Sequence, residues 1–130
     1  MALSSNKNRV EQQGELVEMP VAASTTIYKN ALLKIKADGH VAPCAAEAGA
    51  VYAGMAYAGA DNSAGADAEV SVQVKRVNAI YCDGSGFSQS DLGSDAYASD
   101  DDTVSTTDAG NEQKVGKIIK VVSATEVLVD

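Results

Sequence analysis

The chain has 130 residues and a formal net charge of −8, with 45% hydrophobic residues but one Phe, five Tyr and no Trp. That length suits a single domain with a real core. The acidic balance argues against a nucleic-acid-binding protein, because such proteins use Lys and Arg to displace counterions from phosphates. Since Ala and Val carry most of the apolar content, we expect a core of small side chains that stabilises the fold modestly.

Composition divides the chain into a polar N-terminal arm, residues 1–14, and a single β domain, residues 15–130. The arm lacks the apolar stretch of a secretory signal. The longest weakly apolar run, residues 41–60, is rich in Ala and Gly and contains Pro43, which is not the composition of a membrane span. We therefore expect no membrane partner.

Two short extended segments open the predicted domain. Residues 15–22 contain Pro20, which has no N–H to donate to a ladder and so indicates an edge or a strand end. Residues 24–28 are rich in β-branched side chains, which favour a strand.

Residues 31–36 then alternate with a period of two, which is typical of a half-buried strand. Leu33 and Ile35 are expected in the core, and Lys34 and Lys36 in solvent. An Asp-Gly dipeptide follows, which favours a tight hairpin turn, and the return strand should begin two residues after it.

The middle of the chain holds the clearest strand pattern. Residues 51–58 are predicted as a strand with glycines at points of close backbone approach, although Ala and Met make a helix the competing interpretation. Residues 61–67 have the composition of a loop. In residues 69–81, valines alternate with polar residues as far as Lys75, and from Val77 the phase shifts. This shift predicts a bulge near Lys75, or a segment covered on both faces.

The C-terminal half alternates turns with short extended segments. Turns are expected at residues 83–86, 100–102 and 108–112, a loop or short helical turn at 87–93, and strands at 96–98, 103–107, 115–122 and 126–130. The last two strands should form a hairpin. About eight short strands spaced about 10 residues apart predict a small antiparallel β-barrel or β-sandwich.

Few side chains could carry chemistry. His40 is the single histidine and lies beside a turn glycine, so a solvated turn residue is a simpler interpretation than a general base. Cys44 and Cys82 lack the spacing of metal ligands, and free thiols are favoured over a disulfide. Residues 100–102 are three consecutive Asp, unlike the alternating ligands of a calcium loop. We expect no catalytic residue, no metal site and no cofactor.

Five segments in a fixed order carry a resemblance to a known family. They are VAASTTIYKNALLKIKADGHVAP (21–43), VYAGMAYAGADNSAG (51–65), VSVQVKR (70–76), GFSQSDLGSDAYASDDDTVSTT (86–107) and VGKIIKVVSATEVLVD (115–130). Together they resemble the small capsid cement or head-decoration proteins of tailed bacteriophages and prophages. The resemblance rests on the order of the segments rather than on one motif, and residues 1–14 lie outside it.

The resemblance implies a non-enzymatic β-barrel or β-sandwich that binds the outer surface of an icosahedral capsid and stabilises contacts between major capsid protein subunits. It implies a homo-oligomer, with a trimer expected and a dimer as the alternative. The protein would be made in the cytoplasm of a bacterial host and end on the outer surface of the virion. Contacts with the capsid or with neighbouring copies are expected from Lys7, Arg9, Val10, Ser24, Thr25, Thr26, Asp38 and His40.

Two other classes of function remain open. The alternative is a β-rich binding module, such as a carbohydrate-recognition decoration protein. Such sites present aromatic faces, so the module would need Tyr52, Tyr57 and Tyr97 to converge on an open surface. An enzyme would need the histidine or one of the cysteines to meet an acid within hydrogen-bond reach in a pocket.

Overall fold

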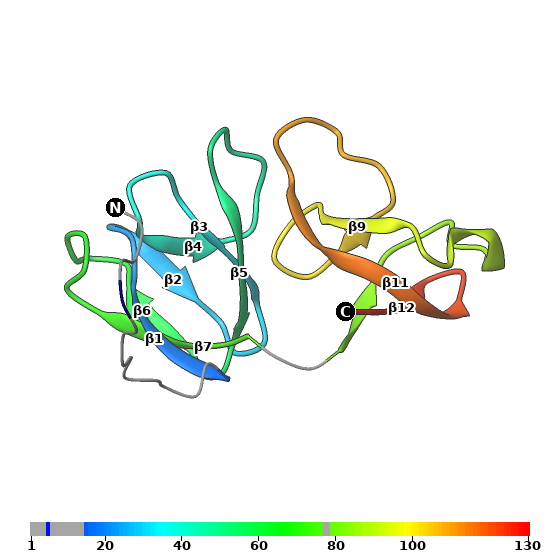
Figure 1. Ribbon diagram of the computed structural model, residues 1–130. Helices are drawn as coiled ribbons and strands as arrows, with labels where there is room; N and C mark the ends of the chain where they lie inside the picture. The colour runs from blue at the N-terminus through cyan, green and yellow to red at the C-terminus, as the bar shows by residue number, and fades with distance from the viewer. Residues whose placement is uncertain (1–4, 6–14, 77–78) are drawn as a thin grey trace.

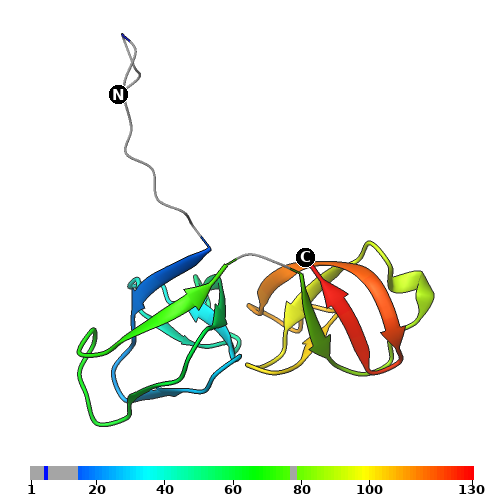
Figure 2. The same ribbon diagram turned by 90° about the horizontal axis from the view of Figure 1, so that it is seen from below.

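The computed structural model describes residues 5, 15–76 and 79–130, which form an all-β fold of twelve strands and one short 3-10 helix. The strands make two five-stranded sheets and one two-stranded pair, and the two larger sheets lie side by side (Figures 1 and 2). The predicted all-β class is confirmed, with more and shorter strands than the eight expected. The division into an arm, residues 1–14, and one domain, residues 15–130, stays a prediction.

The first sheet is built from the N-terminal half of the chain. Its order is β1 (Leu16–Pro20), β7 (Ser71–Lys75), β5 (Val51–Ala56), β3 (Leu32–Ile35) and β4 (Val41–Pro43), all antiparallel. The short strands β2 (Thr25–Ile27) and β6 (Ala60–Asn62) pair separately. The predicted hairpin is confirmed, because Gly39 adopts φ +90° and its N–H donates to the Lys36 carbonyl at 2.8 Å.

Strand β5 settles the choice between strand and helix for the segment that was ambiguous in the sequence. Gly54 adopts φ +144°, a conformation that residues with a side chain rarely take. A Cβ at this position would lie 2.6 Å from the Lys75 carbonyl oxygen and 2.8 Å from Val74 Cγ1 on β7. The glycine therefore lets two backbones approach closely, as predicted from its place in a strand.

The second sheet is built from the C-terminal half. Its order is β10 (Val104–Ser105), β9 (Asp95–Ala98), β11 (Gln113–Ser123), β12 (Glu126–Val129) and β8 (Ile80–Asp83). The predicted C-terminal hairpin is confirmed, with Ser123 opposite Glu126 at its tip. The predicted short helical turn is the 3-10 helix Gln89–Asp91.

Single bridges bring the two ends of each sheet together. Val21, just after β1, pairs in parallel with Val41 on β4, and Asp83 on β8 pairs in parallel with Thr103 beside β10. Each sheet therefore curls until its edge strands touch at one point. This curling encloses apolar side chains within each sheet.

The two apolar cores meet at strand β3. Leu33 is fully buried in the first core, together with Val41, Ala56 and Val74 among others. Leu32, its direct neighbour, belongs instead to the second core, where Cys44 from the first half of the chain also packs. Adjacent side chains of a strand point to opposite faces, so one strand supplies both cores.

The prediction that Lys34 is solvated is wrong. The pairing of β3 with β5 shifts register between Leu33 and Lys34, and the Lys34 side chain is only 8% exposed. Its Nζ lies 3.3 Å from Glu47 Oε1 and donates to the Ala45 carbonyl at 3.3 Å. A buried ammonium needs such partners, because leaving it unpaired would cost several kcal/mol, about 3–5 kcal/mol in known cases.

The single long strand predicted over residues 69–81 is also wrong. The segment contains β7 and β8, which belong to different sheets. The phase shift noticed after Lys75 marks the passage of the chain from the first sheet to the second. The segment therefore forms two separate strands, not one strand with a bulge near Lys75.

Candidate interaction surface

The structure brings the described contact candidates to one end of the first sheet. Ser24, Thr25 and Thr26 lie at and just before β2, and Asp38 and His40 lie in the turn between β3 and β4. Two backbone contacts join these segments: the parallel bridge between residues 21 and 41, and the bond of 2.9 Å from the N–H of residue 22 to the carbonyl of residue 41. The candidates Lys7, Arg9 and Val10 lie outside the described residues.

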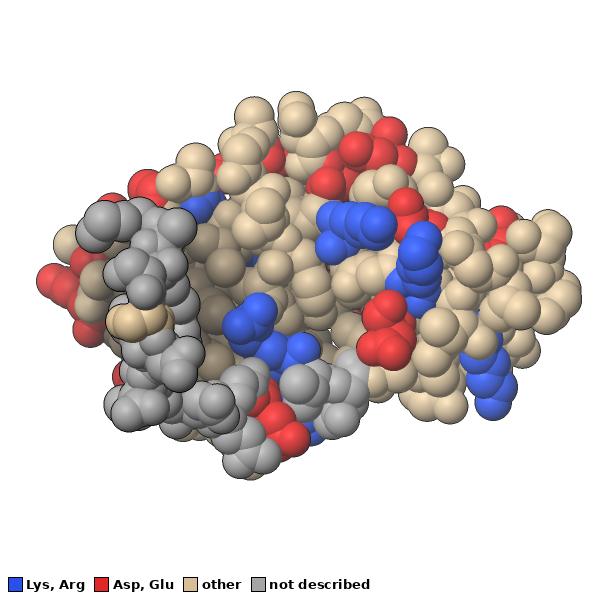
Figure 3. All heavy atoms as spheres, viewed as in Figure 1, with Lys and Arg blue, Asp and Glu red and all other residues tan. Residues whose placement is uncertain are grey.

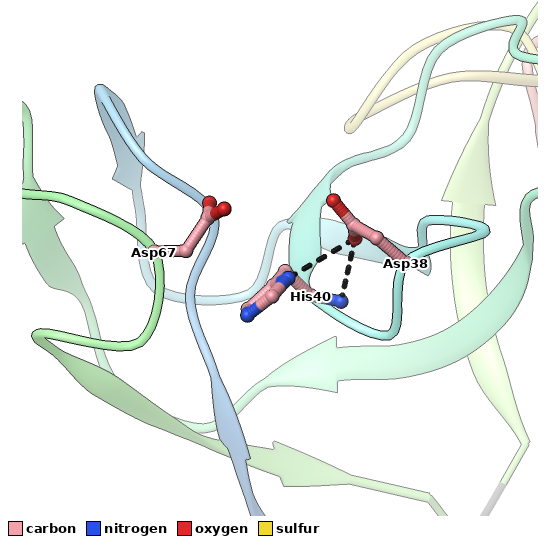
Figure 4. Close-up of side chains that lie close together, drawn as sticks. All are labelled: Asp38, His40 and Asp67. Carbon is pink, nitrogen blue, oxygen red and sulfur yellow. Dashed lines mark hydrogen bonds and ion pairs between the residues drawn. The ribbon is translucent and has the colours of Figure 1, made fainter.

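A third acidic residue joins this end from a distant loop. Asp67 lies between β6 and β7, and its Oδ1 accepts a hydrogen bond of 2.8 Å from the Ala23 N–H. One ligand atom from each of Asp38, His40 and Asp67 lies within 4.8 Å of the other two. Figure 4 shows Asp38, His40 and Asp67. We call these three residues, together with Ser24, Thr25 and Thr26, the polar end.

The imidazole of the polar end lies between two carboxylates. His40 Nδ1 is 3.1 Å from Asp38 Oδ1, and the same oxygen accepts the His40 backbone N–H at 3.0 Å. These contacts lower the pKa of Asp38, with the backbone hydrogen bond as the largest cause. The carboxylates are exposed, and such a donor set offers hydrogen-bond acceptors to a partner or one nitrogen and two oxygens to a divalent cation.

The loop that carries Asp67 is held by one buried amide. Asn62, 2% exposed, donates from Nδ2 to the carbonyls of Ala22 at 2.9 Å and Ala66 at 3.0 Å, with a longer bond to Val21 at 3.4 Å. The absence of a side chain at Gly65 provides space for this amide, because a Cβ at position 65 would collide with the Asn62 side chain. Asn62 therefore ties the segment before β2 to the segment before β7.

Sequence reasoning missed Asp67 and Asn62. Both lie in a stretch whose composition predicted a loop, and Asp67 is separated by 44 residues from the backbone that it binds. The structure makes Asn62 the last residue of β6, so the loop predicted over residues 61–67 is wrong for its first two residues. The burial of this amide depends on partners that are distant along the chain, which local composition does not reveal.

The acidic run at residues 100–102 builds a turn. Asp100 Oδ1 accepts hydrogen bonds from Asp102 N at 2.8 Å, Thr103 N at 2.7 Å and Thr103 Oγ1 at 3.0 Å. Partial burial raises the pKa of Asp100, but these three hydrogen bonds outweigh it and lower the pKa overall. The Asp100 carboxylate therefore stabilises the turn that contains it.

Exposed lysine side chains lie along β11 in the second sheet. Asp95 Oδ1 on β9 accepts from Lys117 Nζ at 2.8 Å and lies 3.1 Å from Lys114 Nζ. The hydrogen bonds from Lys117 and then Lys114 lower the pKa of Asp95. On the face in Figure 3, Lys and Arg side chains are spread over the surface with Asp and Glu side chains between them.

Both cysteines are free thiols buried in the second core. Burial raises the pKa of Cys44 to about 12 and that of Cys82 to about 11. Thiols with such pKa values stay protonated at neutral pH and are weak nucleophiles. Their contribution is to packing.

Stability should fall as the pH rises above about 9, because both thiols ionise more easily in the unfolded chain than in the folded one. A raised folded-state pKa gives stability that is present below the unfolded-state value and lost above it. Near pH 10 each thiol should cost about 1.4 kcal/mol of unfolding free energy. Urea unfolding of the wild type and of Cys44→Ala at neutral pH and near pH 10 measures this. The gap between the two proteins should narrow at the higher pH, and an unchanged gap would contradict the assignment.

The tyrosines of the carbohydrate alternative do not share an open surface in the way expected. Tyr52 packs against the second core, which makes its ring unavailable as an open face. Tyr97 is half-buried on β9. Tyr57 is 52% exposed, and the other strongly exposed tyrosines are Tyr28 and Tyr81, which sequence reasoning passed over.

Comparisons with known proteins add no relative. No family model, no curated protein and no solved structure matches the chain. Among the residues whose structure is described, no helix is both long enough and apolar enough to cross a membrane.

Proposed function

We propose that this chain is a non-enzymatic structural protein of a phage head, which binds the outer surface of the icosahedral capsid and cements contacts between major capsid protein subunits. The proposal starts from the ordered segments that resemble head-decoration proteins. The observation that carries it is the convergence of Ser24, Thr25, Thr26, Asp38 and His40 on one polar end. Such an end offers several hydrogen-bonding groups to a neighbour at once.

The physical demands of a cement protein fit this arrangement. Each contact can be weak, because a subunit held at one point meets its second contact at high effective concentration. An interface of about 800 Å² per partner, repeated around a symmetry axis, is of the usual size for specific binding. A homotrimer, with a dimer as the alternative, would place several polar ends around such an axis. The acidic net charge of −8 keeps free copies apart before assembly.

Capsids prepared without the protein test the proposal. They should lose thermal or osmotic stability, and adding the purified protein back should restore it. If neither property changes, the cement function is refuted.

The polar end can be tested separately with a matched pair of variants. Thr25→Arg places a bulky cation at the polar end, and Thr107→Arg places the same cation at an exposed position near the second sheet. The affinity for capsids should fall about tenfold for Thr25→Arg, a loss of 1.4 kcal/mol, and stay at the wild-type level for Thr107→Arg. If the two variants bound capsids with equal affinity, the contact surface would lie elsewhere on the protein. A chain lacking residues 1–14 should also bind less tightly if that arm bridges to a neighbour.

A further inference from the structure

The exposed aromatic side chains of this protein are confined to three tyrosines. Tyr28, Tyr57 and Tyr81 are 71%, 52% and 60% exposed, although the whole chain has only five Tyr and one Phe. They come from three places in the chain: after β2, after β5 and on β8. Leaving a large aromatic face in water gains nothing for folding, so a surface that gathers such faces suggests a ligand.

Each of the three tyrosines lines a different hollow, and all three hollows share Asn30. The hollow with Tyr57 has a volume of about 430 Å³, that with Tyr81 about 300 Å³ and that with Tyr28 about 270 Å³. We call them the Asn30 hollows. The volume of the hollow with Tyr57 lies in the range of ligand sites, which is about 300–1,000 Å³.

The residues around Asn30 are held in place by backbone bonds. Asn30 adopts φ +69°, its N–H donates to the Ala56 carbonyl at 2.8 Å, and the next N–H, from Ala31, donates to the Tyr28 carbonyl at 3.1 Å. On the far side, the Leu32 N–H donates to the Asp101 carbonyl at 2.8 Å. The acidic turn of the second sheet is thereby fixed against the tyrosine-bearing segment of the first. The hollows are thus formed before any ligand arrives, which lowers the entropic cost of binding.

The charged groups of the hollows have both signs. Lys29 lines the hollows with Tyr57 and Tyr28, and Lys75 lines the one with Tyr57. Asp101 and Asp102 line two of the hollows, and Asp83 lines the one that holds Tyr81. Carboxylates accept several hydrogen bonds from neighbouring hydroxyl groups, and the amide of Asn30 can both donate and accept. Aromatic faces beside carboxylates and an amide match a pyranose ring, which has an apolar C–H face and a rim of hydroxyls.

We propose that the Asn30 hollows are a binding site for a neutral saccharide. Three carboxylates and two lysines line the hollows, so their charges nearly balance and favour neither a strongly anionic nor a strongly cationic ligand. An extended peptide would need free backbone groups along a sheet edge. The end of β8 is closed at Asp83 by its bridge to Thr103, which leaves less edge for a peptide to pair with. This activity is independent of capsid cementing and concerns a different surface from the polar end.

The test uses the free full-length protein, so its outcome does not depend on capsids. An array of neutral and anionic oligosaccharides identifies binders, and titration calorimetry gives their dissociation constants. We expect at least one neutral oligosaccharide to bind with a dissociation constant below about 1 mM. Tyr57→Ala and Tyr81→Ala should each weaken that binding about tenfold.

The control variant is Leu92→Ala, which removes an exposed apolar side chain away from the hollows and should bind like the wild type. Circular dichroism checks that all three variants fold; if one tyrosine variant does not, the other carries the test. The proposal is overturned if no neutral oligosaccharide binds or if both tyrosine variants bind like the wild type. A basic proline-rich peptide is titrated as a competing ligand class. The proposal is also overturned if this peptide or an anionic oligosaccharide binds more tightly than every neutral oligosaccharide.

Discussion

Replacing Leu33 with alanine should lower the free energy of unfolding by about 3 kcal/mol, a typical cost for truncating a fully buried leucine. Leu33 is 0% exposed and packs in the first core from the central part of the sheet, between β5 and β4. Strands on both sides hold their backbones in place by hydrogen bonds, so the cavity cannot close by a small shift. Urea unfolding followed by circular dichroism measures the loss.

The matched control is Leu92→Ala. Leu92 is 48% exposed, so the same truncation there should change the free energy of unfolding by less than about 0.5 kcal/mol.

The Leu33 variant also tests the single domain predicted for residues 15–130. Since β3 supplies side chains to both cores, the Leu33 variant should lower the urea midpoint of unfolding of both sheets together. A separate, unshifted transition of the second sheet would contradict that prediction.

Replacing Asn62 with alanine should cost about 3 kcal/mol, at the upper end for groups left unsatisfied by a lost hydrogen-bond partner. Its Nδ2 is the shared donor to the Ala22 and Ala66 carbonyls, and the side chain is 2% exposed. The loop bearing Asp67 should loosen as a result. Faster hydrogen exchange of the Ala23 amide, which donates to Asp67, would report this directly.

An exposed amide provides the comparison for this variant. Gln89→Ala, in the short 3-10 helix, removes an exposed amide side chain and should leave both the stability and the exchange of the Ala23 amide unchanged. If Asn62→Ala behaved like Gln89→Ala, the buried amide would not be the group that organises the polar end.

Local patterns in the sequence predicted most of the strands, because alternation and turn dipeptides act over a few residues. The hairpin at Gly39, the strand around Gly54 and the C-terminal hairpin all follow from such signals. The same rules predicted Lys34 wrongly. Alternation assumes one buried face and one wet face, and β3 has a core on both sides with a register shift between them.

The candidate sites depended on contacts that local patterns do not contain. Asp38 and His40 were visible as a turn, but their neighbour Asp67 arrives from a loop between other strands. The exposed tyrosines illustrate the same limit. Tyr28 and Tyr81 are 53 residues apart in the sequence (81 − 28) and lie at hollows that share Asn30 only because the two sheets meet there.

The sharing of β3 between two cores has a consequence for how the chain is made. Every strand of the first sheet precedes residue 76, so that sheet can form on the ribosome while the second is still being synthesised. Until the later strands emerge, Leu32 and Cys44 have no core to enter. The nascent protein therefore exposes an apolar face until the rest of the chain is made. Adding about fifty residues at about 5–20 residues per second takes a few seconds. Small side chains on that face, such as the Cys44 thiol, limit how strongly it attracts other nascent chains.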